Sequence, residues 1–594
     1  MKRFLITTAD ERTWVTDRPV LFLGGWCCVH GRRAAWKELD SEVVPYHWDD
    51  RKKYFDDYSY LQRTYEAILG KVAQELNAFH HTGHSLRYWR ILLGPWLYNF
   101  THTLFDRWTM TQRAAETYDV EGTIILDFAL TDMIAPDFLS VRFDNVPWNH
   151  YLFGRAIRYQ NAIPWKASPA LIESAGESQK TTEKPPGGIL RRTVEGLCSA
   201  YTGLTTRSDE PMIISSYLPR LEEIKLQMAL GQMPKLWAIP SMKNAAQPDL
   251  AIRSGLKIQA EGVDVFQRFL SIMIPEQIPT VYLEGYRDLL KAVGDLSWPS
   301  RPRVIFTSNL FQFCEVFQAW AAEKTEAGAP LVIGQHGGQI GVGRWVPGEE
   351  HQVGISDRYL TWGWQDERAA TYPACALTIV NKKPNPCRKD GDLLLVTVPV
   401  RLYGFRNNSW PVGPTQSERY LSEQLSFARA LPGQVRASLV VRLNLSVDRK
   451  MMTFYADRWK EMFPETSIDD STSSIEGCLR RSRLVVFTYN ATGFVEMLAR
   501  NIPTIFFWNP NFFELRAAAE SYFKALKDTD VFHETPEAAS VHVAKIWDDV
   551  GAWWNDPAVQ QARANFCDHY ARVANKPIRL LKESLTTVKP MGSV

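Results

Sequence analysis

The sequence has few of the features that mark a membrane-spanning, secreted or nucleic-acid-binding protein. Its eight cysteines form no C-x-x-C pair and no repeated spacing, so neither a zinc site nor a disulfide framework is indicated. Residues 1–14 lack the apolar core of a signal peptide, and the chain has no run of about 18 apolar residues. The formal net charge is only +2, which provides no bulk field for nucleic acid. These features predict a protein of the reducing cytoplasm without a nucleic-acid partner.

The 594 residues exceed the size at which one hydrophobic core stops growing, so more than one domain is expected. Segments that read as a strand followed by a helix recur along the chain, which predicts mostly parallel sheets covered on both faces. A polar, Pro-containing stretch at 380–392 separates two such series. We therefore expect an α/β fold with two doubly wound lobes that face a central cleft. The expected units are an N-terminal lobe at 1–388 with a helical insertion at about 50–120, a C-terminal lobe at 389–570 and a tail at 571–594. The helical insertion is expected to break at Gly94-Pro95.

Ligands in parallel α/β sheets bind beyond the carboxyl ends of the strands, so polar residues at those ends are candidates for the site. The stretch TYNATG (488–493) lies between a buried strand and a helix. The unpaired N–H groups and positive dipole end of that helix favour a phosphate. The polar turn contributes Thr488, Asn490, Thr492 and Gly493, and Glu496 one turn later could accept hydrogen bonds from a ribose. An ordinary helix cap with a first-turn glutamate explains the same residues.

A second polar stretch, QHGGQIGVG (335–343), also follows a buried strand. It places His336 at the strand end beside Gln335, Gly337 and Gly338, and glycines permit close approach of the backbone to a ligand. Histidine is suited to act as a general base or as a donor to phosphate. The spacing matches neither a dinucleotide-binding fingerprint nor a P-loop. A structural histidine in a Gly-rich turn is the alternative.

Arg442 near the end of a third strand, VVRLN (440–444), could form a bidentate contact to phosphate, or could be a salt-bridged arginine of the sheet. Asp127, Asp132 and Asp144 follow or lie near a strand of the first lobe, and any of them could act as a base or nucleophile. The D-x-D pattern from Asp390 to Asp392 precedes a strand instead of following one, which favours chemistry without a metal.

The stretches QHGG, VVRLN and TYNATG, in this order, resemble the CDP-glycerol glycerophosphotransferases and the capsule Kdo transferases. More closely, the whole chain is similar to a family of transferases encoded in bacterial O-antigen clusters. The segments that carry this similarity are RPVLFLGGWC, PYHWDDR, HSLRYWRILLGPWL, FTSNLF, QHGG and SDRYLTWGW. The resemblance implies the GT-B fold, in which two Rossmann-like lobes face each other and the second holds most of the donor nucleotide.

The resemblance also implies roles for individual residues. His336 matches the reactive histidine of a Trp-His-Gly segment, and Arg442 matches the arginine of an Arg-x-His that contacts phosphate. Asn444 stands where that motif has its histidine. The turn at 488–492 matches the TDYSS turn that binds the CDP moiety, with Tyr489 in place of the aspartate.

The expected function is therefore a glycosyltransferase of bacterial surface polysaccharide synthesis. It would transfer a sugar, CMP-linked and of the Kdo type, onto a glycan or lipid-linked glycan without a metal or a further cofactor. The replacement of the motif's histidine by Asn444 disfavours the alternative of a CDP-alditol phosphotransferase. A non-catalytic scaffold that binds nucleotide or glycan is the third alternative. Peripheral contact with the inner membrane or with other glycan-synthesis enzymes is compatible with all three.

Overall fold

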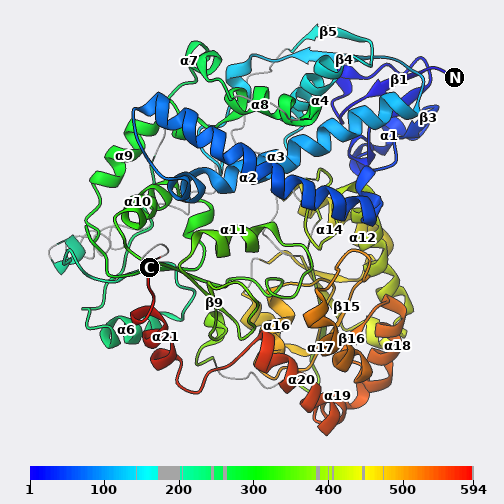
Figure 1. Ribbon diagram of the computed structural model, residues 1–594. Helices are drawn as coiled ribbons and strands as arrows, with labels where there is room; N and C mark the ends of the chain where they lie inside the picture. Colours follow the sequence, from blue (N-terminus) through cyan, green and yellow to red (C-terminus); the bar gives the residue numbers. More distant parts are fainter. Residues whose placement is uncertain are drawn as a thin grey trace.

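The strands of the protein form three parallel sheets (Figure 1). The computed structural model describes the whole chain except residues 142, 171–200, 204, 243–245, 259–263, 383–387, 399, 405–406, 444–448, 472–473 and 591–594. The mixed α/β fold with parallel sheets is thus confirmed. The range 1–388, expected to contain one lobe, contains two sheets.

The first sheet has the strand order β3-β2-β1-β4-β5, in which the order reverses beside the first strand as in doubly wound folds. Its strands are β1 (Arg3–Ile6), β2 (Val20–Phe22), β3 (Ser41–Val43), β4 (Val120–Asp127) and β5 (Trp165–Pro169). The helices of this region are α1 (Arg33–Trp36), α2 (Arg51–His80), α3 (Leu86–Thr117) and α4 (Val146–Gln160). This unit lies in the upper part of Figure 1, and its long helices α2 and α3 run below the sheet toward the middle of the molecule.

Helices α2 and α3 occupy the region of the expected helical insertion. The expected break at Gly94-Pro95 was wrong, because α3 runs continuously from Leu86 to Thr117. Pro95 removes one backbone hydrogen bond, but residues 91–104 of this helix are buried, and the packing they make outweighs that cost. Gly94 allows a close contact, since a Cβ atom there would lie 2.7 Å from Cε1 of His351.

The middle sheet runs in sequential order, β10-β9-β8-β7-β6, without a reversal among its described strands. This sheet thus steps in one direction, whereas the first and third sheets reverse their strand order. Its strands are β6 (Met212–Ile213), β7 (Ile305–Thr307), β8 (Leu331–Gly334), β9 (Arg358–Thr361) and β10 (Thr371–Pro373). The helices of this region are α6 (Arg220–Ala229), α7 (Leu250–Gly255), α8 (Val265–Gln277), α9 (Tyr286–Gly294), α10 (Glu315–Glu326) and α11 (Pro347–Ile355).

The third sheet has the order β13-β12-β11-β14-β15-β16, the 3-2-1-4-5-6 order of the Rossmann fold. Its strands are β11 (Asp392–Thr397), β12 (Leu439–Leu443), β13 (Ser467–Asp469), β14 (Ser482–Phe487), β15 (Thr504–Phe507) and β16 (Phe532–His533). The helices are α12 (Gly413–Ala430), α13 (Gly433–Arg436), α14 (Arg449–Met462), α15 (Ile475–Leu479), α16 (Thr492–Ala499), α17 (Ala517–Asp528), α18 (Pro536–Ile546), α19 (Val550–Trp554) and α20 (Pro557–Tyr570). The order reverses between β11 and β14, so the expected ligand position is the carboxyl end of these two strands.

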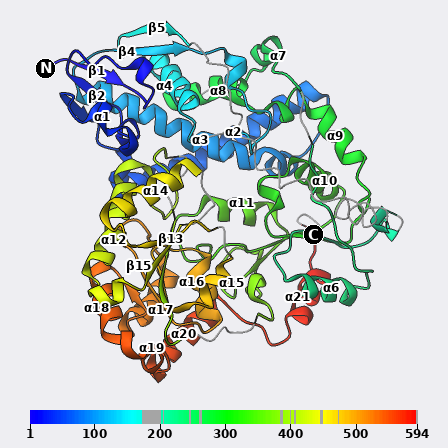
Figure 2. The same cartoon turned by 180° about the vertical axis from the view of Figure 1, so that it is seen from behind.

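The last helix, α21 (Pro577–Thr586), leaves the third sheet and packs beside α6 of the middle sheet (Figures 1 and 2). Leu581 and Leu585 of α21 are buried in a cluster with Ile213 and Leu226 of the middle-sheet region. The segment 571–594, expected to be a tail, therefore contributes to the core of the middle lobe.

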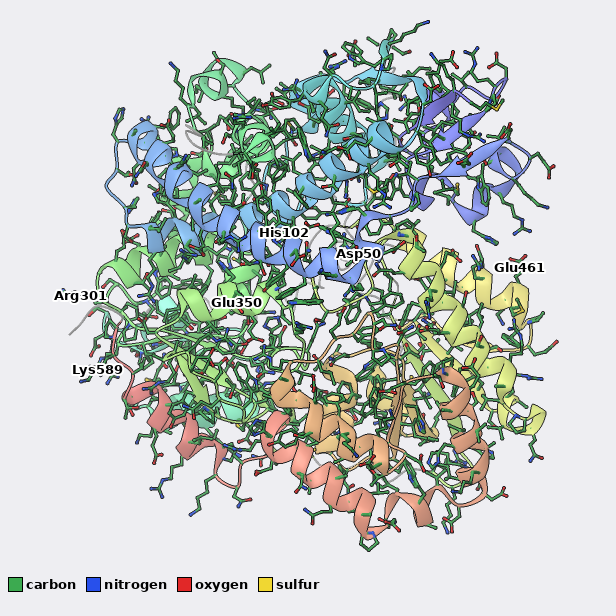
Figure 3. All side chains as sticks on the ribbon, turned by 45° about the vertical axis from the view of Figure 1, so that its right-hand side comes forward. Asp50, His102, Arg301, Glu350, Glu461 and Lys589 are labelled. Carbon is green, nitrogen blue, oxygen red and sulfur yellow. The ribbon has the colours of Figure 1, made fainter. Side chains whose placement is uncertain are left out.

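A buried polar cluster joins the first unit to the third. Asp106 and Arg107 of α3 are fully buried and paired, and Arg107 Nη1 donates to the carbonyl of Gly404, 2.6 Å away, in the loop after β11. The backbone N–H of Asn407 in the same loop donates to Nδ1 of His102, which Figure 3 labels on α3. The first unit thus holds the loop that leaves β11, at the strand end where a ligand is expected.

Candidate active site

The two stretches predicted from the sequence meet between the middle and third sheets. QHGG follows β8, whose last residue is Gly334, and TYNATG connects β14 to α16. The backbone N–H of Gly338 donates to Oγ1 of Thr492 over 3.2 Å. A Cβ atom at Gly338 would lie 2.8 Å from the carbonyl oxygen of Ala491 and 2.8 Å from a methyl of Val495. The glycine is therefore required for the two lobes to approach this closely.

The Gly-rich loop continues into the third lobe beyond this contact. Gly343 forms an isolated antiparallel bridge with Leu515, and the N–H of Arg344 donates to the carbonyl of Glu514 over 2.9 Å. The cleft between the two lobes is consequently closed along one side by backbone hydrogen bonds.

Gln335 has a structural role instead of the predicted contact with a ligand. Its Nε2 donates to the carbonyls of Gly337 (2.8 Å) and Ile340 (3.0 Å), and its Oε1 accepts from the N–H of Trp362 (2.9 Å) and Nε1 of Trp364 (2.8 Å). A glutamine amide has two donor hydrogens and two acceptor lone pairs, so all four are used. Gln335 holds the Gly-rich loop against the loop after β9 and has no capacity left for phosphate.

Thr488 and Gly493 also serve the third lobe itself. The Thr488 hydroxyl lies 2.6 Å from the hydroxyl of Tyr420 and 3.3 Å from the carbonyl oxygen of Val396, and the side chain is buried. A Cβ atom at Gly493 would collide with the ring of Phe487. These two residues shape the turn, whereas the remaining polar groups of the turn face the start of α16.

Asn490 is the residue of this turn that the fold leaves unsatisfied. Its side chain is 0% exposed, and in the described part of the chain neither Nδ2 nor Oδ1 has a hydrogen-bond partner. The N-cap residue Ala491 has no side chain that could accept from the first N–H groups of α16. A buried amide without a partner is costly, so the Asn490 side chain and the uncapped start of α16 are candidates to contact a ligand.

His336 lies half-buried at the end of β8, on the middle-lobe side of the same contact. Its Nε2 lies 3.4 Å from Nε2 of Gln312, and its ring lies 6.2 Å from the rings of Tyr217 and Phe311. A Cβ atom at the next residue, Gly337, would lie 3.9 Å from the Thr492 hydroxyl. His336 is thus one residue from the junction of the lobes. Glu496 is half-buried in α16, one turn beyond its start.

Arg442 forms a salt bridge within the third sheet, which is one of the two roles that its sequence position allowed. Its Nη1 lies 2.9 Å from Oδ2 of Asp469 and 3.3 Å from Sγ of Cys478, and the side chain is 12% exposed. β11 separates its strand, β12, from β14. Asn444 lies outside the described residues. Arg442 is accordingly a salt-bridged arginine at a neighbouring strand end, and its contact with phosphate remains a prediction.

The carboxylates expected as catalytic groups belong to the first unit. Asp127 ends β4, is 53% exposed and pairs with Arg158 of α4 over 2.6 Å. Asp144 pairs over 2.6 Å with Arg401 in the loop after β11, and so links the first unit to the third. Neither residue comes from the sheet that carries His336. The assignment of a catalytic carboxylate to this unit has no support in these contacts.

Residues near His336 in the middle sheet were not predicted from the sequence. The loops after β6 and β7 bring Ser215, Tyr217, Asn309 and Gln312 to the same edge of this sheet, because parallel strands end together. The polar residues Ser308 and Asn309 of FTSNLF (306–311), which follow a short apolar run, are the sequence signal for this loop.

Charged residues surround a further pocket of about 380 Å³ between the middle and third lobes, lined by Glu349, Asp366, Arg368 and Arg516 among others. The buried Glu349 carboxylate accepts from the N–H of Gly341 (2.8 Å) and from both guanidinium groups, which locks α11 to the Gly-rich loop. Burial raises the pKa of the neighbouring Glu350, labelled in Figure 3. The paired charges here stabilise the cleft wall.

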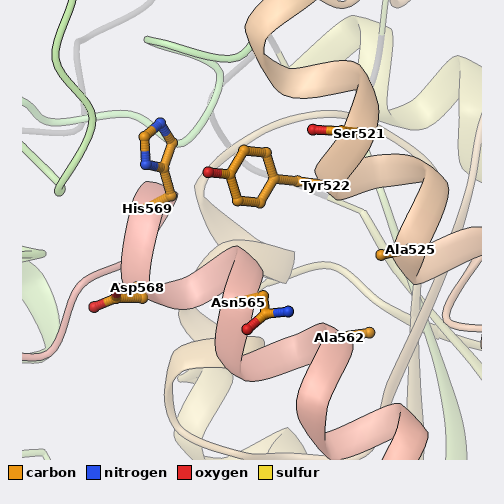
Figure 4. Close-up of a pocket in the computed structure, with 7 residues that line it drawn as sticks. All are labelled: Ser521, Tyr522, Ala525, Ala562, Asn565, Asp568 and His569. Atoms are coloured by element: carbon orange, nitrogen blue, oxygen red, sulfur yellow. The ribbon is translucent and has the colours of Figure 1, made fainter.

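A pocket of about 410 Å³ lies between α17 and α20 (Figure 4). The rings of Tyr522 and His569 stack at its mouth with centroids 4.8 Å apart. None of the predicted site residues lines it. In the described ranges, no three or more His, Cys, Asp or Glu side chains are grouped as ligands for a metal ion. No helix within those ranges combines the length and apolar character needed to cross a membrane.

Comparison with solved structures finds chains of low similarity. The spinosyn rhamnosyltransferase SpnG complexed with spinosyn aglycone is 13% identical, with 51% of this chain and 76% of that chain covered and a TM-score of 0.28. MurG of Acinetobacter baumannii is 12% identical, with 64% and 99% covered and a TM-score of 0.30. A UDP-N-acetylglucosamine 2-epimerase from Listeria monocytogenes is 11% identical, with 61% and 92% covered and a TM-score of 0.35. These scores are too low to assign a reaction.

No curated protein matches the sequence at a significant level. The family model described as LIC12162 family transferase matches residues 3–585. Because this match spans nearly all of the 594 residues, the chain belongs to the LIC12162 family of transferases.

Proposed function

We propose that this transferase is a glycosyltransferase whose nucleotide-activated donor binds where the loop after β8 meets the start of α16. The observation that carries the proposal is the fully buried Asn490 amide, which has no partner in the described chain. It lies at the carboxyl end of β14, beside the reversal of strand order in the third sheet. Ligands of Rossmann-type sheets bind at this position.

The start of α16 supplies the electrostatic part of the site. Its first N–H groups and the positive end of its dipole favour an anion, and the Asn490 amide can donate to the same group. A donor phosphate held there would leave with its charge already stabilised by fixed dipoles, which lowers the barrier to departure. The charge stabilisation comes from the chain itself, in agreement with a reaction that needs no metal.

His336 is placed to receive the acceptor's proton. In the proposed step the acceptor O–H bond breaks and its oxygen forms a bond to the anomeric carbon. The bond from that carbon to the donor phosphate oxygen breaks, and its electron pair leaves with the phosphate. The proton passes to His336, whose ring lies on the middle-lobe side of the junction. Contact of His336 with the phosphate is the second role that its position allows.

The donor and the biological setting follow from the resemblance to enzymes of capsule and O-antigen synthesis. We propose a CMP-linked ulosonic acid of the Kdo type as donor and a glycan or lipid-linked glycan of the bacterial surface as acceptor. The enzyme would then work in the cytoplasm or at the inner membrane, with nucleotide-sugar as co-substrate and no further cofactor. The resemblance supports these details, and the site geometry supports the binding of a nucleotide phosphate.

A thermal-shift screen with CMP, CDP, UDP and GDP tests the proposal. A ligand of the folded state raises the melting temperature by mass action, by the equivalent of about 2.7 kcal/mol at 100 times its Kd. We expect CMP to give the largest shift and Asn490→Leu to abolish it. No shift with any of the four nucleotides would refute nucleotide binding. Separate incubations with a CMP-sugar and with CDP-glycerol then distinguish sugar transfer from alditol phosphate transfer.

A further inference from the structure

The edge of the middle sheet has a second polar surface on the side of His336 away from α16. It comes from the loops after β6 and β7, which lie beside β8 in the strand order. Ser215, Tyr217, Asn309 and Gln312 are all half-buried there, as is His336 itself. The proposed donor position accounts for none of the first four residues.

The loop after β6 has an unusual backbone conformation. Ser215 (φ 49°) and Tyr217 (φ 65°) both occupy the left-handed region, which is sparsely populated by residues other than glycine and most costly for bulky ones. Such conformations cost on the order of 1–3 kcal/mol each and persist where the surroundings impose them, often at functional sites. The Tyr217 side chain is half-buried and packs against the apolar cluster of the middle sheet, while its hydroxyl is hydrogen-bonded by the loop after β7.

Hydrogen bonds from the loop after β7 hold this conformation. The Ser215 hydroxyl donates to Oδ1 of Asn309 over 2.6 Å, and Nδ2 of Asn309 donates to the Tyr217 hydroxyl over 2.7 Å. The N–H of Ser308 donates to the carbonyl of Ser215 over 3.0 Å. Asn309 is therefore the residue that fixes the orientation of the Tyr217 phenol relative to the ring of His336, 6.2 Å away.

The phenol retains a proton to donate. It accepts from Asn309, and the described residues contain no acceptor for its own O–H. Partial burial raises the pKa of Tyr217 while the hydrogen bond from Asn309 lowers it, with burial the larger effect, so the group stays protonated at neutral pH. The Nε2 atom of Gln312 lies 3.4 Å from Nε2 of His336, and its Oε1 accepts no hydrogen bond within the described part of the chain. A phenol that can donate and an amide oxygen that can accept thus both lie near the imidazole.

We propose that Tyr217, Asn309 and Gln312 form the acceptor subsite, and that it binds an uncharged sugar unit through its hydroxyl groups. The inference rests on the proposed glycosyltransferase function and names the acceptor class for it. The lining consists of a phenol, two amides, a hydroxyl and an imidazole beside the ring of Phe311, a combination that suits the hydroxyls and apolar face of a neutral hexose. Tyr217 and Gln312 would contact the sugar, and Asn309 would position the phenol.

The subsite would place the attacking hydroxyl between His336 and the donor. The ring centroid of His336 lies 6.2 Å from that of Tyr217, and the N–H of Gly338, two residues further on, donates to the Thr492 hydroxyl at the start of α16. A sugar held by the phenol and the Gln312 amide would present a hydroxyl to the imidazole, across from the phosphate held at α16. One histidine would then serve a donor and an acceptor that occupy different lobes.

Saturation-transfer NMR on the full chain tests the proposal with defined probes. The probes are methyl α-D-glucopyranoside, galactopyranoside and mannopyranoside, with methyl β-D-glucuronide as a charged analogue, each in the presence of CMP. We expect at least one neutral glycoside to bind and the glucuronide to bind more weakly. Loss of one hydrogen bond should weaken binding by about 3- to 10-fold in Tyr217→Phe. Gln312→Ala should weaken it to a similar extent.

Tyr372→Phe is the matched control, because Tyr372 is a half-buried tyrosine on β10 at the far edge of the same sheet. It should leave glycoside binding unchanged, and the response to CMP should be the same in all three variants and the wild type. Absence of binding by every neutral glycoside, or equal binding by wild type, Tyr217→Phe and Gln312→Ala, would overturn the subsite. The CMP titration judges the donor site separately, so the failure of one proposal is distinguishable from the failure of the other.

Discussion

Replacing Asn490 by leucine should stabilise the protein without ligand and remove its response to nucleotide. Leucine repeats the branched heavy-atom skeleton of asparagine but needs no hydrogen bonds. The amide it replaces is 0% exposed and has no partner for either polar atom in the described chain. The free protein therefore loses a buried unsatisfied group, whereas the nucleotide complex loses the contact that satisfied it.

The expected size of the stabilisation follows from the cost of leaving an amide unsatisfied. That cost is about 1–3 kcal/mol for a buried polar group. For a cooperative unit of 150–250 residues, 1 kcal/mol shifts the melting temperature by about 2–4 °C, so a rise of roughly 2–12 °C is expected. The nucleotide should bind at least about 10-fold more weakly, since hydrogen bonds to charged groups contribute about 1.5–3 kcal/mol each.

Differential scanning fluorimetry with and without CMP measures both effects on the same samples. The matched control is Asn149→Leu, which removes a buried amide that is satisfied. Asn149 Oδ1 accepts from Nε of Arg107 over 2.8 Å, and its Nδ2 donates to the carbonyls of Phe143 (2.8 Å) and Asn145 (2.9 Å). The control should therefore lower the melting temperature. A fall of similar size in Asn490→Leu, or an undiminished CMP response, would refute the reasoning.

Three further predictions concern the lobe junction, a buried histidine and the link to the first unit. Gly338→Ala should weaken CMP binding and lower the free energy of unfolding by about 1–3 kcal/mol, measured in urea, because its Cβ would lie 2.8 Å from the Ala491 carbonyl oxygen. Burial lowers the pKa of His351 to about 3 in the folded protein, whereas the same side chain in the unfolded chain has a pKa of about 6.5. As the pH drops from about 6.5 toward 4, the unfolded chain therefore binds a proton that the folded chain does not, and the free energy of unfolding falls. His351→Leu should flatten this part of the stability–pH profile. Arg107→Met should cost about 3–5 kcal/mol in urea, since it leaves the buried Asp106 carboxylate without its guanidinium partner.

Each of these predictions has a matched control. Gly354→Ala, in α11, adds a Cβ with no atom within 4 Å and should not destabilise. An unchanged pH profile in His351→Leu would show that this histidine does not titrate on unfolding. The double variant Asp106→Asn with Arg107→Met should recover part of the loss, and additive losses would contradict the pairing.

The sequence identified the two stretches that meet at the junction because each follows a buried apolar run and precedes a helix or a Gly-rich turn. The helix predicted after TYNATG begins at Thr492, and QHGG follows directly on β8. Such local patterns indicate which residues lie at the end of a strand. Ligands of parallel α/β sheets bind at the carboxyl ends of the strands, so both stretches could be assigned to a site before any contact was known, although β8 and β14 belong to different sheets.

Other features depend on tertiary contacts that no local pattern encodes. The amide of Gln335 could be assigned a structural role only once Trp362 and Trp364 were placed beside it. The partner of Arg442, Asp469, is 27 residues away on the next strand. The presence of three sheets was missed for the same reason, since strands of two to eight residues show their type but not the sheet they join. The left-handed backbone conformation of Tyr217 could not be predicted from the sequence, because tyrosine rarely adopts it.

The return of α21 to the middle lobe has a practical consequence for work on separate fragments. A fragment that ends at residue 570 would leave the apolar surface that Leu581 and Leu585 cover open to solvent, on the lobe that carries His336. Producing residues 388–570 as a separate donor-binding fragment, beside a fragment that ends at residue 387, would expose the same apolar surface, because neither fragment contains α21. A bulky fusion directly after residue 586 would interfere with the packing of α21 on the middle lobe, so an affinity tag is better placed at the N-terminus.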